Sequence, residues 1–130
     1  MIVGCGIDTE EKSRFSKHLS NFEKSEFISM VFTEGEKENF LDFDPELCVP
    51  IAFSFKEAMF KALGNTWTTS AIDWKDMEIK FLSSPQEKNY ELSFSGVASE
   101  MLESLGNPNI ISSFDFNDKY STFDIILKHE

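Results

Sequence analysis

The chain has 130 residues, of which 41% are hydrophobic and 27% charged, a composition typical of a folded globular domain. Twelve Lys and Arg against 23 Asp and Glu give a formal net charge of -11, which argues against general binding to nucleic acid or an anionic membrane. No apolar run reaches the ~20 residues of a membrane-spanning helix, and the start of the chain lacks the pattern of a signal peptide. We therefore expect one cytoplasmic domain over residues 1–130, with Cys5 and Cys48 as reduced, core-type thiols.

The first elements are predicted from an apolar segment and a capping pattern. Residues 1–7 are short, apolar and rich in glycine, which predicts an opening strand. Asp8 followed three residues later by Glu11 has the spacing of a helix N-cap with its reciprocating Glu. A helix is therefore expected to begin at Asp8.

The next helices are predicted from their start and stop signals. Thr33 and Glu36 repeat the capping spacing and predict a short helix. Two prolines and several acids predict that residues 42–50 are at least partly loop. The strongest helix pattern then covers about residues 49–63, with Gly64 as its stop.

The second half of the chain alternates in the manner of strands. After a polar loop at 65–73, a helix is expected at 97–105, ended by Gly106. The predicted strands are 77–81, 90–94, 110–116 and 120–127. Because these strands pair with their neighbours in sequence, the predicted fold class is α+β, an antiparallel sheet packed against helices.

The helix at 49–63 is apolar over most of its circumference when its residues are placed about 100° apart. Such a helix is largely buried, so its charges lie at an edge or in a cleft. Ser54, Glu57 and Lys61 form a narrow polar stripe. Lys56 lies within the apolar arc, where its stem is expected to snorkel the charge to the surface.

Asp8, Glu57 and Lys61 each admit two interpretations. In the first interpretation, Glu57 and Lys61 form an ordinary i,i+4 ion pair, and Asp8 caps a helix. Alternatively, the two carboxylates, held by a strand end and a buried helix, bind Mg²⁺, which takes its remaining ligands from water and substrate phosphates. Lys61 then meets a phosphate beside that metal. Spacing alone does not separate the two interpretations.

Several motifs occur in a fixed order along the chain. They are Gly6-Ile7-Asp8 with Ser13-Arg14-Phe15, Phe32-Thr33-Glu34 with Glu36 and Phe40, Phe53-Ser54-Phe55-Lys56-Glu57-Ala58 with Lys61-Ala62-Leu63-Gly64, Trp74-Lys75-Asp76-Met77-Glu78-Ile79, and Leu92-Ser93-Phe94-Ser95-Gly96 with Ala98 and Leu105-Gly106. In order, spacing and total length, this set resembles the holo-acyl-carrier-protein synthases, the small class of 4′-phosphopantetheinyl transferases. The resemblance covers essentially the whole chain and implies the fold of that family.

The resemblance also implies a reaction. Coenzyme A donates its phosphopantetheine arm to a serine hydroxyl of an apo acyl carrier protein, and 3′,5′-ADP leaves. Asp8 and Glu57 are expected to ligate Mg²⁺, which offsets charge on the leaving group. Glu57 is the expected acceptor of the serine proton, and Lys61 the holder of a phosphate, so the three residues form the expected catalytic group.

Binding residues follow from the same resemblance. Arg14 matches a basic residue that in this family faces the acidic carrier protein. Lys17 lies with Arg14 in a candidate basic patch that would meet the same carrier, and the alternative is that this patch is a solvated helix face. Small members of the family are expected to be homotrimers with active sites between subunits. Coenzyme A binding is expected at Lys56, Lys61, Gly64 and Ser113.

The chain departs from the family pattern at three positions. Ala52 stands where many members have an Arg, and Asp115-Phe116 stands where many have Ser-His. From the resemblance, these changes are expected to remove groups that help bind the phosphates or nucleotide of coenzyme A. They favour an alternative in which the protein keeps the fold but binds coenzyme A weakly and acts as a binding or assembly protein. An unrelated acidic interaction module is a third interpretation, and the carrier's pathway, whether fatty-acid biosynthesis or another, stays open.

Overall fold

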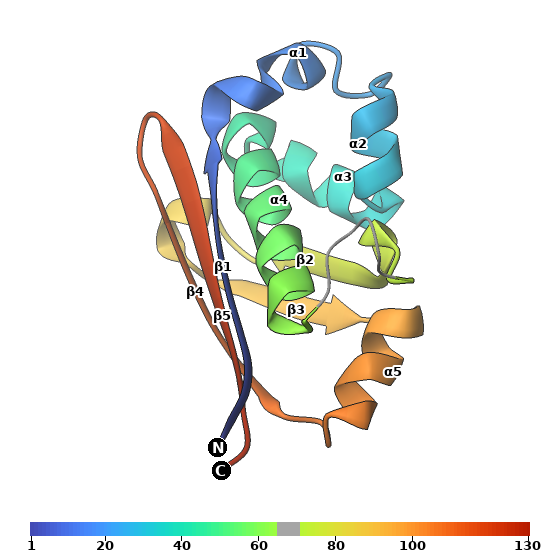
Figure 1. The fold of residues 1–130 in the computed structure, drawn as a ribbon. Helices are drawn as coiled ribbons and strands as arrows, with labels where there is room; N and C mark the ends of the chain where they lie inside the picture. Colours follow the sequence, from blue (N-terminus) through green and yellow to red (C-terminus); the bar gives the residue numbers. More distant parts are fainter. Residues whose placement is uncertain (65–70) are drawn as a thin grey trace.

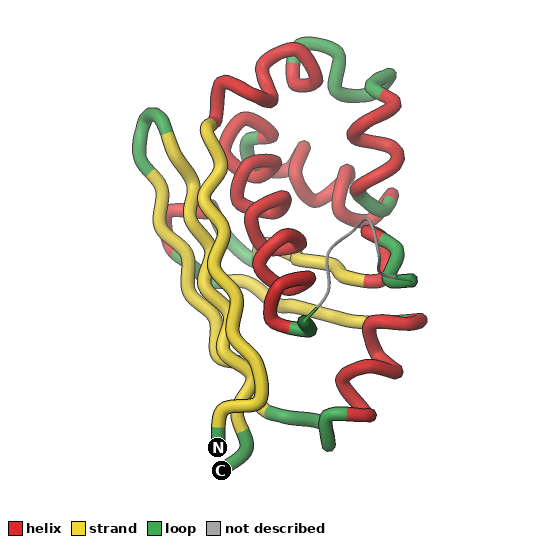
Figure 2. The backbone as a smooth tube through the Cα atoms, viewed as in Figure 1, coloured by secondary structure: helices red, strands yellow, loops and turns green. Residues whose placement is uncertain are grey.

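A computed structural model describes residues 1–64 and 71–130, so most of the loop predicted at 65–73 lies outside the described residues. Within that part of the chain, three strands form an antiparallel sheet in the order β1-β5-β4 and two more strands form a second antiparallel pair. The α-helices lie on one side of the larger sheet, and α4 (Pro45–Ala62) packs directly on it, as Figures 1 and 2 show. The strands are β1 (Ile2–Glu11), β2 (Met77–Phe81), β3 (Tyr90–Phe94), β4 (Asn109–Phe116) and β5 (Tyr120–Lys128). The predicted α+β class with an antiparallel sheet is confirmed.

The helical elements follow the predicted signals at most positions. They are η1 (Lys12–Phe15), α1 (Ser16–Leu19), α2 (Glu26–Val31), α3 (Glu34–Asp42), α4 (Pro45–Ala62), η2 (Trp74–Asp76), η3 (Pro85–Glu87) and α5 (Gly96–Ser104). Thr33 and Glu36 form the predicted capping box at the start of α3. Gly64 follows the end of α4 with a φ of 76°, a conformation that a residue with a Cβ adopts only at a cost. Among the described helices, none combines the length and apolar character needed to cross a bilayer.

The opening strand is longer than predicted. β1 continues to Glu11, and Asp8 lies in the middle of the strand opposite Phe123 of β5 instead of capping a helix. The helical segment that follows, η1, has no side-chain cap. The predicted cap is wrong because ladder pairing with a strand at the far end of the sequence outweighs a local spacing signal.

The central helix α4 begins earlier than predicted. Asp44 caps it by accepting a hydrogen bond from the Glu46 backbone N–H at 3.0 Å, and Pro45 occupies the first turn, where a missing N–H costs little. Pro50 lies inside the helix, so the loop predicted within 42–50 is confined to residues 43–44, between α3 and α4. Burial of nearly every residue from Cys48 to Phe60 outweighs the proline penalty.

Two glycines let β1 lie directly on the backbone of α4. A Cβ built at Gly6 would lie 2.0 Å from the Ala58 carbonyl oxygen, and one at Gly4 would lie 2.2 Å from the Ala62 carbonyl oxygen. No side chain fits between the two backbones at these positions. Because side chains alternate along a strand, Asp8 and Glu10 point to the same α4-facing side as the glycines, and both are buried.

The core between sheet and helices is built largely from phenylalanine. Phe55 of α4 packs on Phe123 of β5 with ring centroids 5.3 Å apart, and Phe123 stacks on Phe114 of β4 at 5.7 Å. Cys48 is buried as expected for a core thiol, and its burial raises the pKa to about 12. Cys5 is instead exposed, on the face of the sheet opposite the core, so its placement as a core thiol is wrong.

Candidate active site

The structure brings Asp8 of β1 to the side of α4 that carries Glu57 and Lys61. Asp8 is buried, and Glu57, at the edge of the helix, is half-buried. Burial raises the pKa of Glu57, and the negative charge of Asp8 raises it further, whereas Lys61 lowers it. The three predicted catalytic residues therefore interact electrostatically across the contact between β1 and α4.

Lys61 is bonded to the strand. Its Nζ donates to the Asp8 Oδ1 atom at 3.1 Å and to the Ile7 carbonyl oxygen at 3.0 Å, while its side chain remains half-exposed. The other Asp8 carboxylate oxygen, Oδ2, is buried and has no hydrogen-bond partner. An orphaned buried carboxylate oxygen is costly unless a proton or cation completes it.

Glu10 is a site residue that the sequence prediction missed. It is buried on the same side of β1 as Asp8, and its carboxylate pairs with Arg14. Burial, then the neighbouring Asp8 carboxyl group, raise the pKa of Glu10 to about 8, whereas Arg14 lowers it. In a strand, residues two positions apart share a face, so the spacing from Asp8 predicts the place of Glu10 once the strand is extended to Glu11.

The carboxylate pair of Asp8 and Glu57 fits a magnesium ion that is completed by a substrate. Mg²⁺ usually takes one or two protein carboxylates and fills its other positions with water and phosphate oxygens. The described residues contain no group of three or more His, Cys, Asp or Glu side chains arranged to hold a metal alone. A cation bound at this site would give the unpartnered Asp8 Oδ2 atom a partner.

The two residues expected to meet a carrier protein lie at the η1–α1 end of the molecule. Arg14 is more than half exposed and its guanidinium lies over the rings of Phe15 and Phe53, at 5.6 and 5.5 Å. Lys17 is exposed and lines a hollow of ≈ 540 Å³ whose other side chains are polar, basic, acidic and aromatic. The further residues of this hollow are His18, Asn21, Lys24, Ser25, Glu26 and Phe27. The positive charges of Lys17 and Lys24 therefore lie in this hollow, offset in part by Glu26.

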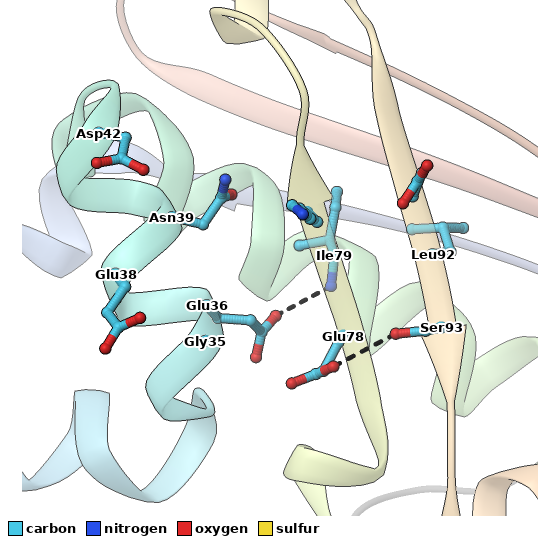
Figure 3. A pocket seen from close by; sticks show the side chains of 11 residues that line it. Gly35, Glu36, Glu38, Asn39, Asp42, Glu78, Ile79, Leu92 and Ser93 are labelled. Carbon is cyan, nitrogen blue, oxygen red and sulfur yellow. Dashed lines mark hydrogen bonds between the residues drawn. The ribbon is translucent and has the colours of Figure 1, made fainter.

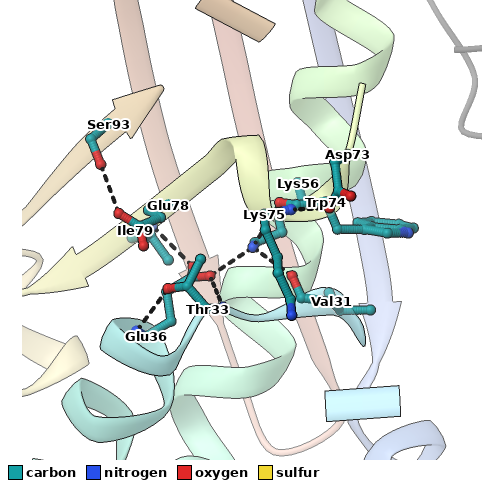
Figure 4. Close-up of polar contacts among 10 residues, drawn as sticks. All are labelled: Val31, Thr33, Glu36, Lys56, Asp73, Trp74, Lys75, Glu78, Ile79 and Ser93. Carbon is teal, nitrogen blue, oxygen red and sulfur yellow. Dashed lines mark hydrogen bonds and ion pairs between the residues drawn. The ribbon is translucent and has the colours of Figure 1, made fainter. Parts of the chain in front are cut away.

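Lys56 lies in the interior, and its predicted snorkelling is wrong. Its side chain is 0% exposed, and Nζ donates to Glu36 Oε1 at 2.7 Å, to the Val31 carbonyl at 2.8 Å and to the Trp74 carbonyl at 3.0 Å (Figure 4). These three acceptors use all the hydrogens of the ammonium group. Burial lowers the pKa of Lys56, and Glu36 opposes that effect. Lys56 thus joins elements of the fold and has no donor left for coenzyme A.

The other expected coenzyme A residues are not brought together within one chain. Gly64 is exposed beyond the end of α4. Ser113 lies on the outer face of the sheet, where its hydroxyl donates to Asp124 Oδ2 at 3.4 Å. Asp8 points to the opposite, helix-covered face, so Ser113 does not share a site with it in the single chain.

The positions that depart from the family pattern differ in their surroundings. Ala52 is fully buried in the core, so an Arg at this position in this chain would place its charge among apolar side chains. Asp115 is exposed, and the Phe116 backbone N–H, then Lys88, hold its pKa below the usual range. Asp115 is therefore a fixed negative charge at neutral pH.

A separate hollow of ≈ 400 Å³ lies between α3 and the β2–β3 pair, away from Asp8 (Figure 3). Its exposed lining is mostly acidic and includes Glu38, Asp42 and Glu91. The buried Glu36 at its base accepts a hydrogen bond from the Ile79 backbone N–H at 3.1 Å. This hollow repels anionic ligands and is not part of the phosphate chemistry expected at Asp8.

The fold and site define a small α+β protein with a carboxylate pair and a lysine where an edge strand meets a buried helix. A family model described as the 4′-phosphopantetheinyl transferase superfamily matches residues 4–110. The chain belongs to this superfamily.

Two curated relatives carry the name holo-(acyl-carrier-protein) synthase. The protein from Trichlorobacter lovleyi is 28% identical over 129 residues, which cover 98% of each chain. The protein from Chlamydia muridarum is 34% identical over 79 residues, which are 60% of this chain and 62% of the relative, so that match spans less than two thirds of the relative's length.

Solved structures share the fold at lower identity. The holo-(acyl-carrier-protein) synthase from Neisseria meningitidis aligns with a TM-score of 0.82 at 21% identity, covering 99% of this chain and 100% of that one. The synthase from Bacillus anthracis str. Ames, in complex with CoA (3′,5′-ADP), aligns with a TM-score of 0.75 at 22% identity, covering 100% and 99%. The fold predicted from the resemblance is therefore confirmed.

Proposed function

We propose that this protein transfers the 4′-phosphopantetheine arm of coenzyme A to a serine of an apo acyl carrier protein and releases 3′,5′-ADP. The observation that carries the proposal is the meeting of Asp8 on β1 with Glu57 and Lys61 on α4. Membership of the superfamily and the names of the curated relatives support the same reaction.

In the proposed mechanism, Asp8 and Glu57 hold Mg²⁺. The ion, when bound, neutralises charge on the pyrophosphate of coenzyme A and on the departing 3′,5′-ADP. Lys61 binds a phosphate oxygen. The serine oxygen forms a bond to the phosphorus next to the pantetheine arm, and the bond from that phosphorus to the oxygen of 3′,5′-ADP breaks.

Glu57 accepts the serine proton in this scheme. Burial and the neighbouring Asp8 raise the pKa of Glu57 above its ordinary value of 4.5, which makes its carboxylate a stronger base than a solvated one. A carboxylate of raised basicity at the edge of the helix meets both requirements for a general base.

The carrier protein is proposed to dock on the basic end of the molecule. Arg14 and Lys17 lie there with Lys24 and His18, while the rest of the chain brings the net charge to -11. A local positive patch orients an acidic partner even where the overall charge slows the encounter. We also propose that the protein acts in the cytoplasm.

The active assembly is proposed to be a homotrimer with sites between subunits. The outer face of the sheet lies opposite the described helices and carries Ile7 and Ile111, which are 59% and 49% exposed. Ser113 lies on this same face, so a coenzyme A site that includes both Ser113 and Lys61 requires a neighbouring copy. Light scattering should report three chains per particle, and a stable monomer at micromolar concentration would contradict the assembly.

The experiment that tests the proposed function compares Glu57→Gln with a matched control, Glu103→Gln. Glu103 is exposed on α5, so its variant makes the same chemical change away from the site. Glu57→Gln should lower the rate of transfer at least about a hundredfold, and Glu103→Gln should leave it unchanged. A Glu57→Gln enzyme with the control's rate would remove Glu57 from the mechanism.

The alternative of a weakly binding family member is favoured by the buried Ala52 and by the fixed charge of Asp115. Neither residue offers a positive group to the phosphates of coenzyme A. If this alternative holds, calorimetry should detect carrier binding while coenzyme A binds weakly and no arm is transferred. The variant Asp115→Ser/Phe116→His should then bind coenzyme A more tightly than the natural chain.

A further inference from the structure

The half-exposed Lys61 turns toward the strand instead of leaving its charge in solvent. Its Nζ is bonded to Asp8 Oδ1 at 3.1 Å and to the Ile7 carbonyl at 3.0 Å. The same ammonium group lowers the pKa of Glu57. Lys61 therefore acts as a counter-cation for both carboxylates that are proposed to hold the metal.

The neighbouring cation, Arg14, also lowers the pKa of Glu57, but its ion pair is with another residue. Its guanidinium pairs with Glu10 and lies over the rings of Phe15 and Phe53. Glu10 itself adds a further carboxyl group beside Asp8. The carboxyl groups on this side of β1 and α4 thus repel one another, and the bond from Lys61 to Asp8 relieves part of that repulsion.

We propose that Lys61 is an internal substitute for the divalent cation. The lysine competes with the metal for Asp8 until a phosphate of coenzyme A draws the lysine away. This inference rests on the proposed function, because it takes coenzyme A as the source of the phosphate. The lysine stem is long and flexible, so its ammonium exchanges one oxygen partner for another without movement of α4. Metal and coenzyme A then favour each other's binding, and Lys61 carries part of that coupling.

The competition has a measurable consequence with an unexpected sign. Removing a phosphate-binding lysine should weaken coenzyme A binding, yet in the absence of coenzyme A it should strengthen metal binding. A half-exposed ion pair contributes up to about 1 kcal/mol, which corresponds to a change of about fivefold in affinity. We therefore expect Lys61→Met to bind Mn²⁺ about fivefold more tightly than the natural chain.

The test titrates Mn²⁺ into the protein and follows the signal of the free ion by electron paramagnetic resonance. Lys61→Met is compared with Lys61→Arg, which keeps a cation, and with Lys128→Met. Lys128 is exposed at the end of β5 opposite Ile2, and its loss changes the formal net charge by the same amount, from -11 to -12. Lys61→Met should bind Mn²⁺ more tightly, and both other variants should match the natural chain.

Coenzyme A gives the second arm of the titration. It should tighten Mn²⁺ binding more in the natural chain than in Lys61→Met, because the variant has no lysine to be drawn away. Equal or weaker Mn²⁺ binding by Lys61→Met, or no Mn²⁺ binding by any variant, overturns the inference. These outcomes are independent of transfer, since the first arm contains neither coenzyme A nor carrier, and a separate transfer assay on the natural chain reports on the proposed function.

Discussion

Replacing Gly6 with Ala tests the contact that brings the site residues together. The new Cβ would lie 2.0 Å from the Ala58 carbonyl oxygen and 2.8 Å from the Ala62 nitrogen, where ordinary contact begins at 3.4 Å. Both atoms belong to the backbone of α4, so no side-chain rotation relieves the clash. Overpacking in a core costs about 1–3 kcal/mol, and we expect the upper end because β1 and α4 must move apart.

The displacement also changes the site, because Asp8 lies two residues farther along β1. A shift of about 1 Å in a reacting group costs on the order of a hundredfold in rate. Gly6→Ala should therefore lower the free energy of unfolding in urea by about 3 kcal/mol. It should also lose transfer activity under conditions where circular dichroism still reports the native fold.

Gly35→Ala is the matched control. Gly35 lies in the first turn of α3, and the nearest atom to its new Cβ is a side-chain oxygen of Thr33 at 3.8 Å. An alanine in a helix is favoured over glycine by up to about 1 kcal/mol, so this variant should be as stable as the natural chain or more so. If Gly6→Ala unfolds and catalyses transfer like Gly35→Ala, the close approach of β1 to α4 does not set the site.

Three further predictions concern buried charges. Lys56→Met should lower the free energy of unfolding by about 3–5 kcal/mol because it leaves the Glu36 carboxylate buried and unpaired, and the double variant Lys56→Met/Glu36→Leu should recover most of that loss in urea denaturation. The pKa of Glu10 is about 8 in the folded protein against an ordinary 4.5, so the folded state binds more protons than the unfolded state between these pH values. The stability of the metal-free protein should therefore fall as pH rises from 4.5 to about 8. Glu10→Gln should flatten that slope, and an unchanged slope would assign it to another group. Ala52→Arg should lower the urea midpoint, since it buries a charge in the core, and a variant of natural stability would show that the arginine reaches solvent.

Elements that depend on local patterns were predictable from the sequence. The β4–β5 hairpin alternates in sequence and pairs locally, with Phe114 opposite Phe123. The capping box of Thr33 and Glu36 uses atoms three residues apart. In each case the chemistry that forms the element lies within a short stretch of chain.

The errors arose where distant parts of the chain decide the structure. Asp8 has the spacing of a cap, yet its backbone pairs with Phe123, far along the sequence. Lys56 was expected to reach solvent, but its acceptors come from Val31, Glu36 and Trp74 on other elements. No pattern near residue 56 specifies those partners.

The site was predictable in part for the same reason. The resemblance placed Asp8, Glu57 and Lys61 together, and the structure shows their mutual interactions. Glu10 shares the side of β1 that carries Asp8 only because the strand continues to Glu11, and that extension depends on pairing with β5. The bond between Lys61 and Asp8 is a tertiary contact that no spacing rule predicts.

The measurement that tests the central claim most directly is the intact mass of an apo acyl carrier protein after incubation with this protein and coenzyme A. With Mg²⁺ present, the carrier's mass should rise by that of one phosphopantetheine arm, and 3′,5′-ADP should appear in equal amount. Chelation of the metal or the substitution Asp8→Asn should suppress both products. A carrier of unchanged mass, incubated with the folded protein and Mg²⁺ and converted in parallel by an active transferase, would contradict the proposed function.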